Sequence, residues 1–204
     1  MKDIQVFDNV VSPHLVRSAA AVFPDQNWPF WHRYNGVTAN KFGSMDRVRI
    51  PQACQAVLDC MAIFAGNVLA HTRSFIDYDL HAAGMHMIPP GGFLARHLDA
   101  ERHPLRPWRR THSIVMFLNE EWSPAWGGEL HIDEYGGIPP KFGRMVVFTT
   151  AENWHQVVPV SLKGDYRKTL ALFAWESDKS AGGVPFAFFQ DGSASPSHDH
   201  VKSP

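Results

Sequence analysis

The pattern of hydrophobic and polar positions changes character near residue 74. After this point short apolar runs alternate with Gly, Pro, Asn and Asp, and such runs are typical of strands separated by turns. Their number and spacing predict an antiparallel sandwich or barrel over about 74–190. The seven strand candidates are GMHMI, GGFLARHLD, HSIVMFLN, GGELHID, RMVVFTT, HQVVPV and KTLALFAW.

Before residue 74 the pattern mainly predicts helices. A short strand, IQVF, precedes Ser12-Pro13, a typical start for a helix that we expect to run to about Phe23. Residues 52–70 carry apolar side chains at helical spacing and predict a helix that covers the core. Between these helices the proline-broken stretch NWPFWHRYNG predicts a loop that acts as a lid or a packing cover.

These patterns predict a single domain over 1–190, mainly β, with helical support from about 1–73. The chain has 204 residues, of which 45% are hydrophobic, and this is enough for one sizeable core. The polar end, 191–204, has few apolar residues, so we expect it to be disordered.

Charge and cysteine content limit the partners and the compartment. The formal net charge is -1, so no overall field attracts nucleic acid or an anionic membrane. The two cysteines, Cys54 and Cys60, exclude a disulfide framework and favour a reducing compartment. No signal-peptide stretch stands at the N-terminus, and no uncharged run approaches the roughly 18 residues of a membrane span. We therefore expect a soluble, cytoplasmic protein with no membrane partner and no nucleic-acid partner.

The stretch FLARHLDAERH contains the first candidate metal ligands. Residues i and i+2 of a strand share a face, so His97 and Asp99 can reach one ion. This signal is weak alone, because the chain has 12 histidines, but His155 opens a later strand candidate and supplies a third ligand. Two imidazoles and one carboxylate leave three octahedral positions open, as in non-haem Fe(II) oxygenases. A closed zinc site needs a fourth protein ligand, and neither cysteine is near.

The strand candidate after His155 carries a cation. Alternation places Arg167 and Thr169 on one face and Lys168 on the other. A guanidinium with a hydroxyl two residues on suits a bidentate grip on a carboxylate, such as the distal carboxylate of 2-oxoglutarate. A wholly structural arginine is the alternative. Lys168 is a second candidate for the same role, but Leu170 and Leu172 share its face.

The ordered motifs over about 84–176 resemble the Fe(II)- and 2-oxoglutarate-dependent oxygenases. The resemblance is to the prolyl 4-hydroxylase-like branch, which includes the oxygen-sensing prolyl hydroxylases. It lies in GGFLARHLD, in SIVMFLNEEW followed by GGELHID, and in PPKFGRMVVF leading to the strand HQVVPV. It implies a double-stranded β-helix (jelly roll, cupin-like). It also implies iron ligation by His97, Asp99 and His155, and binding of the 2-oxoglutarate C5 carboxylate by Arg167 with help from Thr169.

Two tyrosines that often bind the cosubstrate in this family have no counterpart. Met87 and Phe117 stand at the matching places, and neither side chain can form their hydrogen bonds. The spacing from His155 to Arg167 is also slightly longer than usual, with 163–165 as the apparent insertion. Leu94 and Phe173 complete the apolar sheath expected around the metal.

The resemblance implies a hydroxylase that uses Fe(II), 2-oxoglutarate and O2, with ascorbate in support, and releases succinate and CO2. The leading hypothesis for the substrate is a prolyl residue of a peptide or protein. The alternatives are a free amino acid or other small molecule, a non-catalytic cupin-like module that binds metal or a carboxylate, and a metal hydrolase. Nucleic-acid repair oxygenases carry a second arginine six positions after the first, where this chain has Phe173. This difference argues against base demethylation.

Substrate contacts are expected from two segments. The loop AERHPLRPWRR directly follows Asp99 and predicts either a basic aromatic flap over the site or a solvated loop. With the aromatic stretch 27–36 it would form a groove for an extended peptide. The candidate substrate residues are Arg96, Arg110, Trp31 and Tyr34.

Overall fold

The structure is a computed structural model that describes residues 3–77, 79–81, 83–178, 186–190 and 194–196. Its helices are α1 (Pro13–Ala21), α2 (Gln52–Val68) and the short 3-10 helix η1 (Pro124–Trp126). Its strands are β1 (Ile4–Asp8), β2 (His32–Asn35), β3 (Ala39–Ser44), β4 (Phe75–Ile76), β5 (Gly84–Ile88), β6 (Phe93–Leu98), β7 (Trp108–Phe117), β8 (Leu130–Ile132), β9 (Gly136–Ile138), β10 (Arg144–Thr149), β11 (His155–Val157), β12 (Arg167–Ser177), β13 (Phe186–Phe189) and β14 (Ala194–Pro196).

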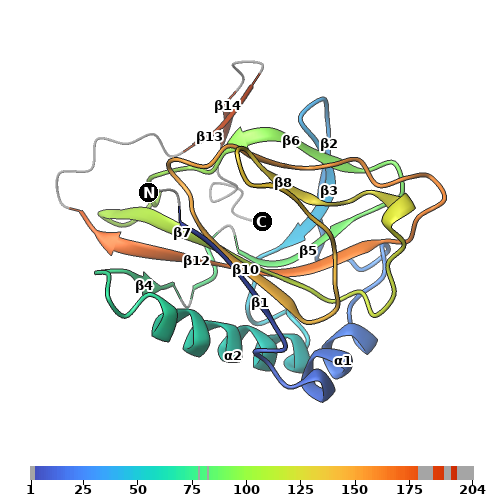
Figure 1. Cartoon of the computed structure of the whole chain (residues 1–204), viewed down its shortest axis with the longest axis horizontal. Coiled ribbons are helices and arrows are strands. Elements are labelled where there is room, and N and C mark those ends of the chain that lie inside the picture. The colour runs from blue at the N-terminus through green and yellow to red at the C-terminus, as the bar shows by residue number, and fades with distance from the viewer. Residues whose placement is uncertain (1–2, 78, 82, 179–185, 191–193, 197–204) are drawn as a thin grey trace.

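One curled antiparallel sheet connects these strands (Figure 1). Its main path runs β1-β10-β7-β12-β5-β3-β6-β11-β8-β9, so strands distant in sequence become neighbours. All seven strand candidates after residue 74 form strands, and the predicted double-stranded β-helix is confirmed. The fold brings β6, β11 and β12, which carry the candidate site residues, around one interior.

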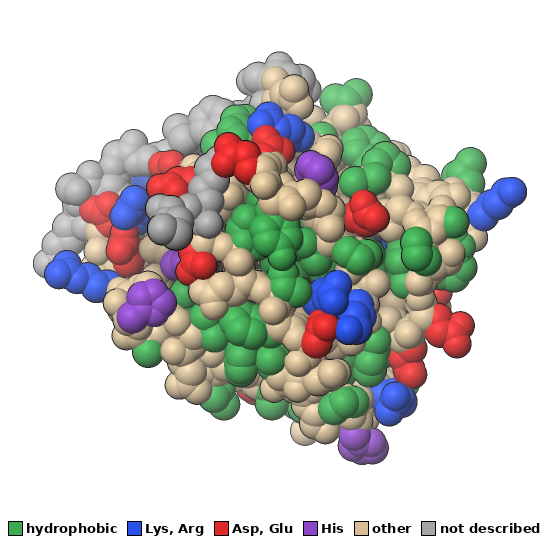
Figure 2. Space-filling view, viewed as in Figure 1, with side chains coloured by type: hydrophobic (Ala, Val, Ile, Leu, Met, Phe, Trp, Pro, Cys, Tyr) green, Lys and Arg blue, Asp and Glu red, His purple; other side chains and the backbone are tan. Residues whose placement is uncertain are grey.

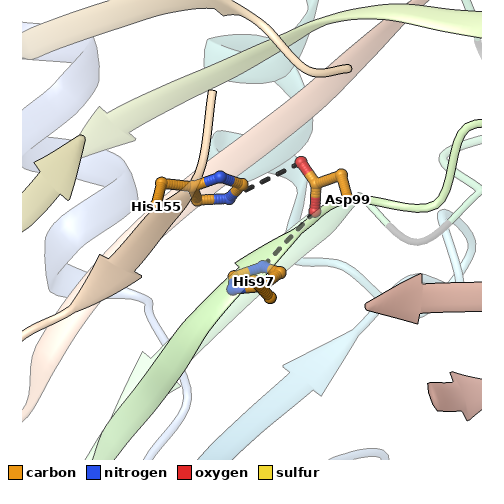
Figure 3. Close-up of side chains that lie close together, drawn as sticks. All are labelled: His97, Asp99 and His155. Carbon is orange, nitrogen blue, oxygen red and sulfur yellow. Dashed lines mark ion pairs between the residues drawn. The ribbon is translucent and has the colours of Figure 1, made fainter. Parts of the chain in front are cut away.

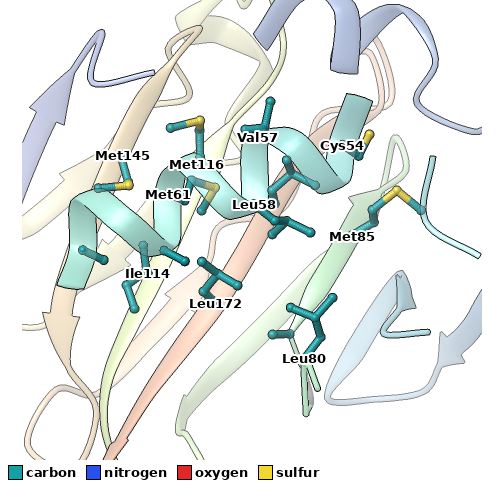
Figure 4. Close-up of a cluster of buried hydrophobic side chains, with 14 of the residues drawn as sticks. Cys54, Val57, Leu58, Met61, Leu80, Met85, Ile114, Met116, Met145 and Leu172 are labelled. Carbon is teal, nitrogen blue, oxygen red and sulfur yellow. The ribbon is translucent and has the colours of Figure 1, made fainter. Parts of the chain in front are cut away.

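Helices α1 and α2 lie side by side and cover one face of the sheet in Figure 1. Alternation along β12 places Leu170 and Leu172 on this face, and α2 buries Leu58 and Met61 against it. Full burial of such a side chain contributes about 1.5–3 kcal/mol. Figure 4 shows the resulting cluster of buried side chains, among them Val57, Met85, Ile114, Met116 and Met145.

The N-terminal part contributes more strands than the one predicted at IQVF, so the prediction of mainly helical support there was incomplete. β1 pairs with β10, as the strand predicted at IQVF allows. β3 lies between β5 and β6, and β2, which begins within the stretch predicted as a loop, pairs with β3. The sequence of β3, ANKFGS, has no apolar alternation. It forms a strand nonetheless, because its backbone pairs with two neighbouring strands.

The C-terminal segment adds a hairpin beside the candidate metal site. β13 pairs with β6 and β14 pairs with β13. Residues 194–196 therefore form a strand where we expected disorder, because hairpin hydrogen bonds join backbone groups and require no apolar side chains. The rest of the predicted tail, 191–193 and 197–204, lies outside the described residues.

The surface agrees with the near-zero net charge. On the face drawn in Figure 2, acidic and basic side chains of the described residues are interspersed. None of the helices in the described part of the chain is long and apolar enough to cross a membrane.

Candidate metal centre and cosubstrate site

Strands β6 and β11 bring the three candidate ligands together (Figure 3). His155 is paired with His97 in the antiparallel register, and Asp99 follows directly after β6. His97 Nε2 lies 3.5 Å from Asp99 Oδ1, and His155 Nε2 lies 3.7 Å from Asp99 Oδ2. All three ligand atoms lie within 4.8 Å of one another. The sequence-predicted triad is therefore a single cluster.

Backbone carbonyls orient both imidazole rings. His97 Nδ1 lies 2.8 Å from the carbonyl oxygen of Ala95, and His155 Nδ1 lies 3.0 Å from that of Asn153. In the tautomer with a proton on Nδ1, each ring donates to its carbonyl and turns the Nε2 lone pair toward the centre. Imidazoles that bind metal ions are commonly held in this way.

The charge states of the cluster suit a metal cation. Burial would raise the pKa of Asp99, but His155, a hydrogen bond with His97 and the Arg110 guanidinium together hold it well below its usual value. Burial and the neighbouring His97 lower the pKa of His155 to about 4, so this imidazole is neutral near pH 7. Ser113 also donates a 2.7 Å hydrogen bond to Asp99 Oδ2. An ionised carboxylate and neutral imidazoles are the forms that bind metal.

Two histidines and one carboxylate, with an open side, fit Fe(II) better than structural zinc. When bound here, Fe(II) with 2-oxoglutarate supplies the oxidising power for C–H hydroxylation. The protein holds the three ligands and orients them. Within the described residues no other group of three potential ligands comes together in this way.

Arg167 lies on the interior face of β12 and is 3% exposed. Its Nε donates a 2.6 Å hydrogen bond to the Gly128 carbonyl, and its guanidinium carbon lies 4.8 Å from the ring centroid of Phe117. Within the described part of the chain no carboxylate forms an ion pair with Arg167. A buried arginine stays charged and needs an anionic partner, so this position suits a carboxylate ligand.

The two neighbours of Arg167 behave as strand alternation predicts. Thr169 is buried on the same face, paired with Phe117 on one side and His86 on the other. Lys168 points to the helical side, where its Nζ lies 5.9 Å from the ring centroid of Phe23. Lys168 is therefore on the wrong face for a cosubstrate ligand.

The expectation for Met87 was wrong. Met87 is paired with Lys168 and packs in the helix-covered core, so it does not line the site. Its neighbours Ile88 and His86 have the interior orientation, because they are paired with Arg167 and Thr169 respectively. The place of a family tyrosine cannot be matched from sequence alone, since a shift of one residue reverses the face of a strand side chain.

Comparison with known proteins relates the β-rich part of the chain to one family. Residues 83–175 match the model of the 2OG-Fe(II) oxygenase superfamily. This part of the chain, a little under half of its length, is therefore similar to that superfamily. No curated protein sequence matches it significantly.

Solved prolyl hydroxylases resemble the chain along most of its length. A prolyl-4-hydroxylase from Pseudomonas putida aligns with a TM-score of 0.64 and 25% identity, covering 87% of this chain and 94% of that one. A prolyl hydroxylase from Trichoplax adhaerens, solved with a hypoxia inducible factor peptide, has a TM-score of 0.60 at 17% identity, covering 85% and 83%. A viral collagen prolyl hydroxylase from Paramecium Bursaria Chlorella virus-1 has a TM-score of 0.60 at 14% identity, covering 85% and 96%. The last two share the fold.

The stretch 100–110, predicted as either a basic aromatic flap or a solvated loop, is partly strand. Residues 108–110 belong to β7, and Arg106 and Arg109 form ion pairs with Asp79 and Glu176. Arg110 is 3% exposed and lies beneath the site, with Nη1 3.7 Å from Asp99 Oδ1. Three of the four arginines in this stretch are thus paired with carboxylates of the described residues.

Trp31 is also not available to a substrate. It is 8% exposed in the hydrophobic core, and its Nε1 donates a 2.7 Å hydrogen bond to the Asp25 carbonyl. Trp31 therefore packs against the core, in agreement with the packing cover predicted for this stretch. Tyr34, three residues later, points to the interior side, because it is paired with Lys41 in the β2–β3 hairpin.

Arg96 belongs to β6, directly before His97, and lines a cavity of about 490 Å³ with Phe93, Leu94, Gln156 and Val157. It forms an ion pair with Asp133 and stacks over Trp154. Arg96 and Tyr34 stay predictions as substrate contacts.

The sequence patterns did not single out Ser113 or Lys41. Ser113 is a polar residue within the apolar run HSIVMFLN, and this break in the run is a signal that points to a buried hydrogen bond. Lys41 gave no such signal, because β3 itself was not predicted.

Proposed function

We propose that this oxygenase hydroxylates a prolyl residue of a peptide or protein, with conversion of 2-oxoglutarate and O2 to succinate and CO2. The observation that carries the proposal is the similarity to the Pseudomonas putida prolyl-4-hydroxylase, at 25% identity over 87% of the chain. The intact His97–Asp99–His155 cluster supports turnover over a purely binding role.

The side chains around the site have separate tasks. Arg167, with Thr169 beside it, would hold the C5 carboxylate of 2-oxoglutarate in a water-poor environment. The three metal ligands would leave one side open to the cosubstrate and to oxygen. Apolar side chains such as Phe117 and Phe173 exclude water from the reacting C–H bond. No side chain has to act as a general acid or base.

A free amino acid or another small acid is the second candidate substrate. The observation that favours it is a third cation, Lys41, on the interior face of β3 beside the site. The non-catalytic module and the metal hydrolase have no observation of this kind in their favour.

Mass spectrometry of candidate substrates tests the proposal. The oxygenase is incubated with Fe(II), 2-oxoglutarate, ascorbate and a set of proline-containing peptides, beside matched peptides with alanine at the proline position. We expect a gain of one oxygen atom on proline peptides alone. Oxygen gain only on free amino acids or other small molecules would overturn the peptidyl substrate, and turnover with Zn(II) under anaerobic conditions would indicate a hydrolase.

A further inference from the structure

Lys41 belongs to the wall of the oxygenase interior. Antiparallel pairing joins Gly43 of β3 to His86 of β5 and His86 to Thr169 of β12, so these three positions form one row across the sheet. Lys41 is two residues from Gly43 and therefore shares its face. Arg167 is two residues from Thr169 and shares that same face.

Lys41 and Arg167 thus stand in the next row, on strands separated only by β5. Neighbouring strands lie about 4.8 Å apart, so the backbones of Lys41 and Arg167 lie about 10 Å apart across β5, and two side chains of this length can reach a common volume. Arg167 leans toward Phe117 and Gly128, whereas Lys41 Nζ lies 5.0 Å from the ring centroid of Tyr34. On its other side β3 pairs with β6, the strand that carries His97.

The electrostatics of the site agree with this placement. Burial lowers the pKa of Lys41 to about 8, while Asp99 raises it and Arg167 lowers it further. Within the described residues Lys41 forms no ion pair with a carboxylate. A half-buried ammonium that lacks a carboxylate partner is stabilised by an anionic ligand.

None of the ligands assigned to the site so far is a partner for the charge of Lys41. Arg110 is the cation closest to Asp99, at 3.7 Å, and offsets that charge. The charges of Fe(II) and of the 2-oxoglutarate dianion cancel overall, so Arg167 and Lys41 together leave the site with a positive charge. This surplus favours a further carboxylate beside Lys41, which forms no ion pair with a carboxylate of the described residues.

We propose that Lys41 binds a carboxylate of the substrate, next to the residue that is hydroxylated. This inference rests on the proposed hydroxylase function. Three sources share this chemistry: free proline, a C-terminal proline, and an acidic residue that follows an internal proline. Tyr34, whose ring faces the Lys41 ammonium, would form the outer wall of this carboxylate subsite.

Calorimetric titration tests the subsite without turnover. The oxygenase is loaded anaerobically with Fe(II) and 2-oxoglutarate and titrated with N-acetyl-L-proline and with N-acetyl-L-prolinamide, which differ only in the carboxylate. We expect the acid to bind at least about tenfold more tightly than the amide, as for a charge-assisted hydrogen bond. Lys41→Met should reduce this ratio to about one, and Lys41→Arg should preserve most of it.

Lys168→Met is the matched control, because Lys168 lies on the opposite face of the same sheet. It should retain the wild-type ratio. An equal affinity of wild type for acid and amide, including the absence of binding by either, would overturn the subsite. The subsite would also be overturned if Lys41→Met kept the wild-type ratio of acid to amide affinity. A fall in the affinity of this variant for 2-oxoglutarate would then indicate that Lys41 contacts the cosubstrate.

Further probes distinguish the source of the carboxylate and separate this inference from the prolyl proposal. Free L-proline against L-prolinamide, and N-acetyl-Pro-Asp-amide against N-acetyl-Pro-Asn-amide, test the other two sources. N-acetyl-L-alanine against its amide tests the need for a proline ring. If the alanine acid and amide differ in affinity as much as the proline pair, and this difference depends on Lys41, the result supports the subsite and contradicts the prolyl substrate.

Discussion

His97 and His155 are directly paired residues of the antiparallel strands β6 and β11, and their ring centroids lie 4.2 Å apart. The two imidazoles are thus fixed by backbone pairing before any metal binds. Asp99 reaches the same point because it directly follows β6.

Removal of His155 should abolish tight iron binding. His155→Ala leaves two ligands, and we expect the affinity for Fe(II) to fall by about 100-fold or more. This is a larger effect than the loss of a residue that only hydrogen-bonds to a ligand. Anaerobic calorimetric titration with Fe(II) measures this change. His131→Ala is the control, because His131 is paired with Gln156 on the adjacent strand and is outside the cluster. Equal loss in both variants would indicate general damage to the fold and contradict the assignment.

Ser113→Ala should weaken the metal site less. The hydroxyl that donates 2.7 Å to Asp99 Oδ2 fixes the orientation of this carboxylate. Loss of such an outer partner typically costs about 10- to 100-fold in metal affinity. The same titration measures it, with Ser177→Ala, at the exposed end of β12, as the control. An Fe(II) affinity within a factor of two of wild type would show that Ser113 has no part in the site.

Much of this site follows from local sequence signals. Strand alternation puts His97 and Asp99 on one side, and the apolar run around 167–173 assigns Arg167 to the interior. Short apolar runs between turn residues likewise identify the strands after residue 74. These features were predictable because each depends on a few consecutive residues.

The remaining features depend on long-range pairing. The position of β3 between β5 and β6 brings Lys41 to the site, and no pattern within ANKFGS predicts this pairing. The interior position of Ile88 in place of Met87 is a matter of register between strands far apart in sequence. Likewise, Arg110 looked like a loop residue, but β7 begins earlier than its apolar run and buries it beneath Asp99.

Arg167→Met should raise the KM for 2-oxoglutarate. Loss of a charged hydrogen bond of about 1.5–3 kcal/mol corresponds to an increase of about 10- to 100-fold. Succinate formation at increasing 2-oxoglutarate concentration measures it. Lys168→Met should leave this KM within about twofold, because its side chain packs on the helical face. A larger increase in this KM for Lys168→Met than for Arg167→Met would contradict the assignment of the cosubstrate contact to Arg167.

Acid should destabilise the metal-free protein partly through His81. Burial, with His103 and Arg110 nearby, lowers the pKa of His81 to about 3 in the folded state. The unfolded chain takes up a proton near pH 6.5, so between these values it binds more protons than the folded protein. The free energy of unfolding therefore falls as the pH drops below 6.5, by up to about 1.4 kcal/mol per pH unit for this group.

Urea unfolding between pH 7 and pH 5 measures this contribution. The variant His81→Asn should lose free energy of unfolding less steeply than wild type over this range. His14→Asn, at an exposed position on α1, is the control and should follow wild type. Parallel curves for wild type and His81→Asn would contradict a neutral buried His81.

Release of succinate tests the central claim most directly. Wild type and Asp99→Ala are incubated with Fe(II), 2-oxoglutarate, ascorbate and O2, and succinate is quantified with and without a proline-containing peptide. The account predicts Fe(II)-dependent succinate from wild type, increased by a peptide that gains one oxygen per succinate, and none from Asp99→Ala. No succinate from wild type, or equal amounts from both proteins, would contradict an oxygenase built on His97, Asp99 and His155.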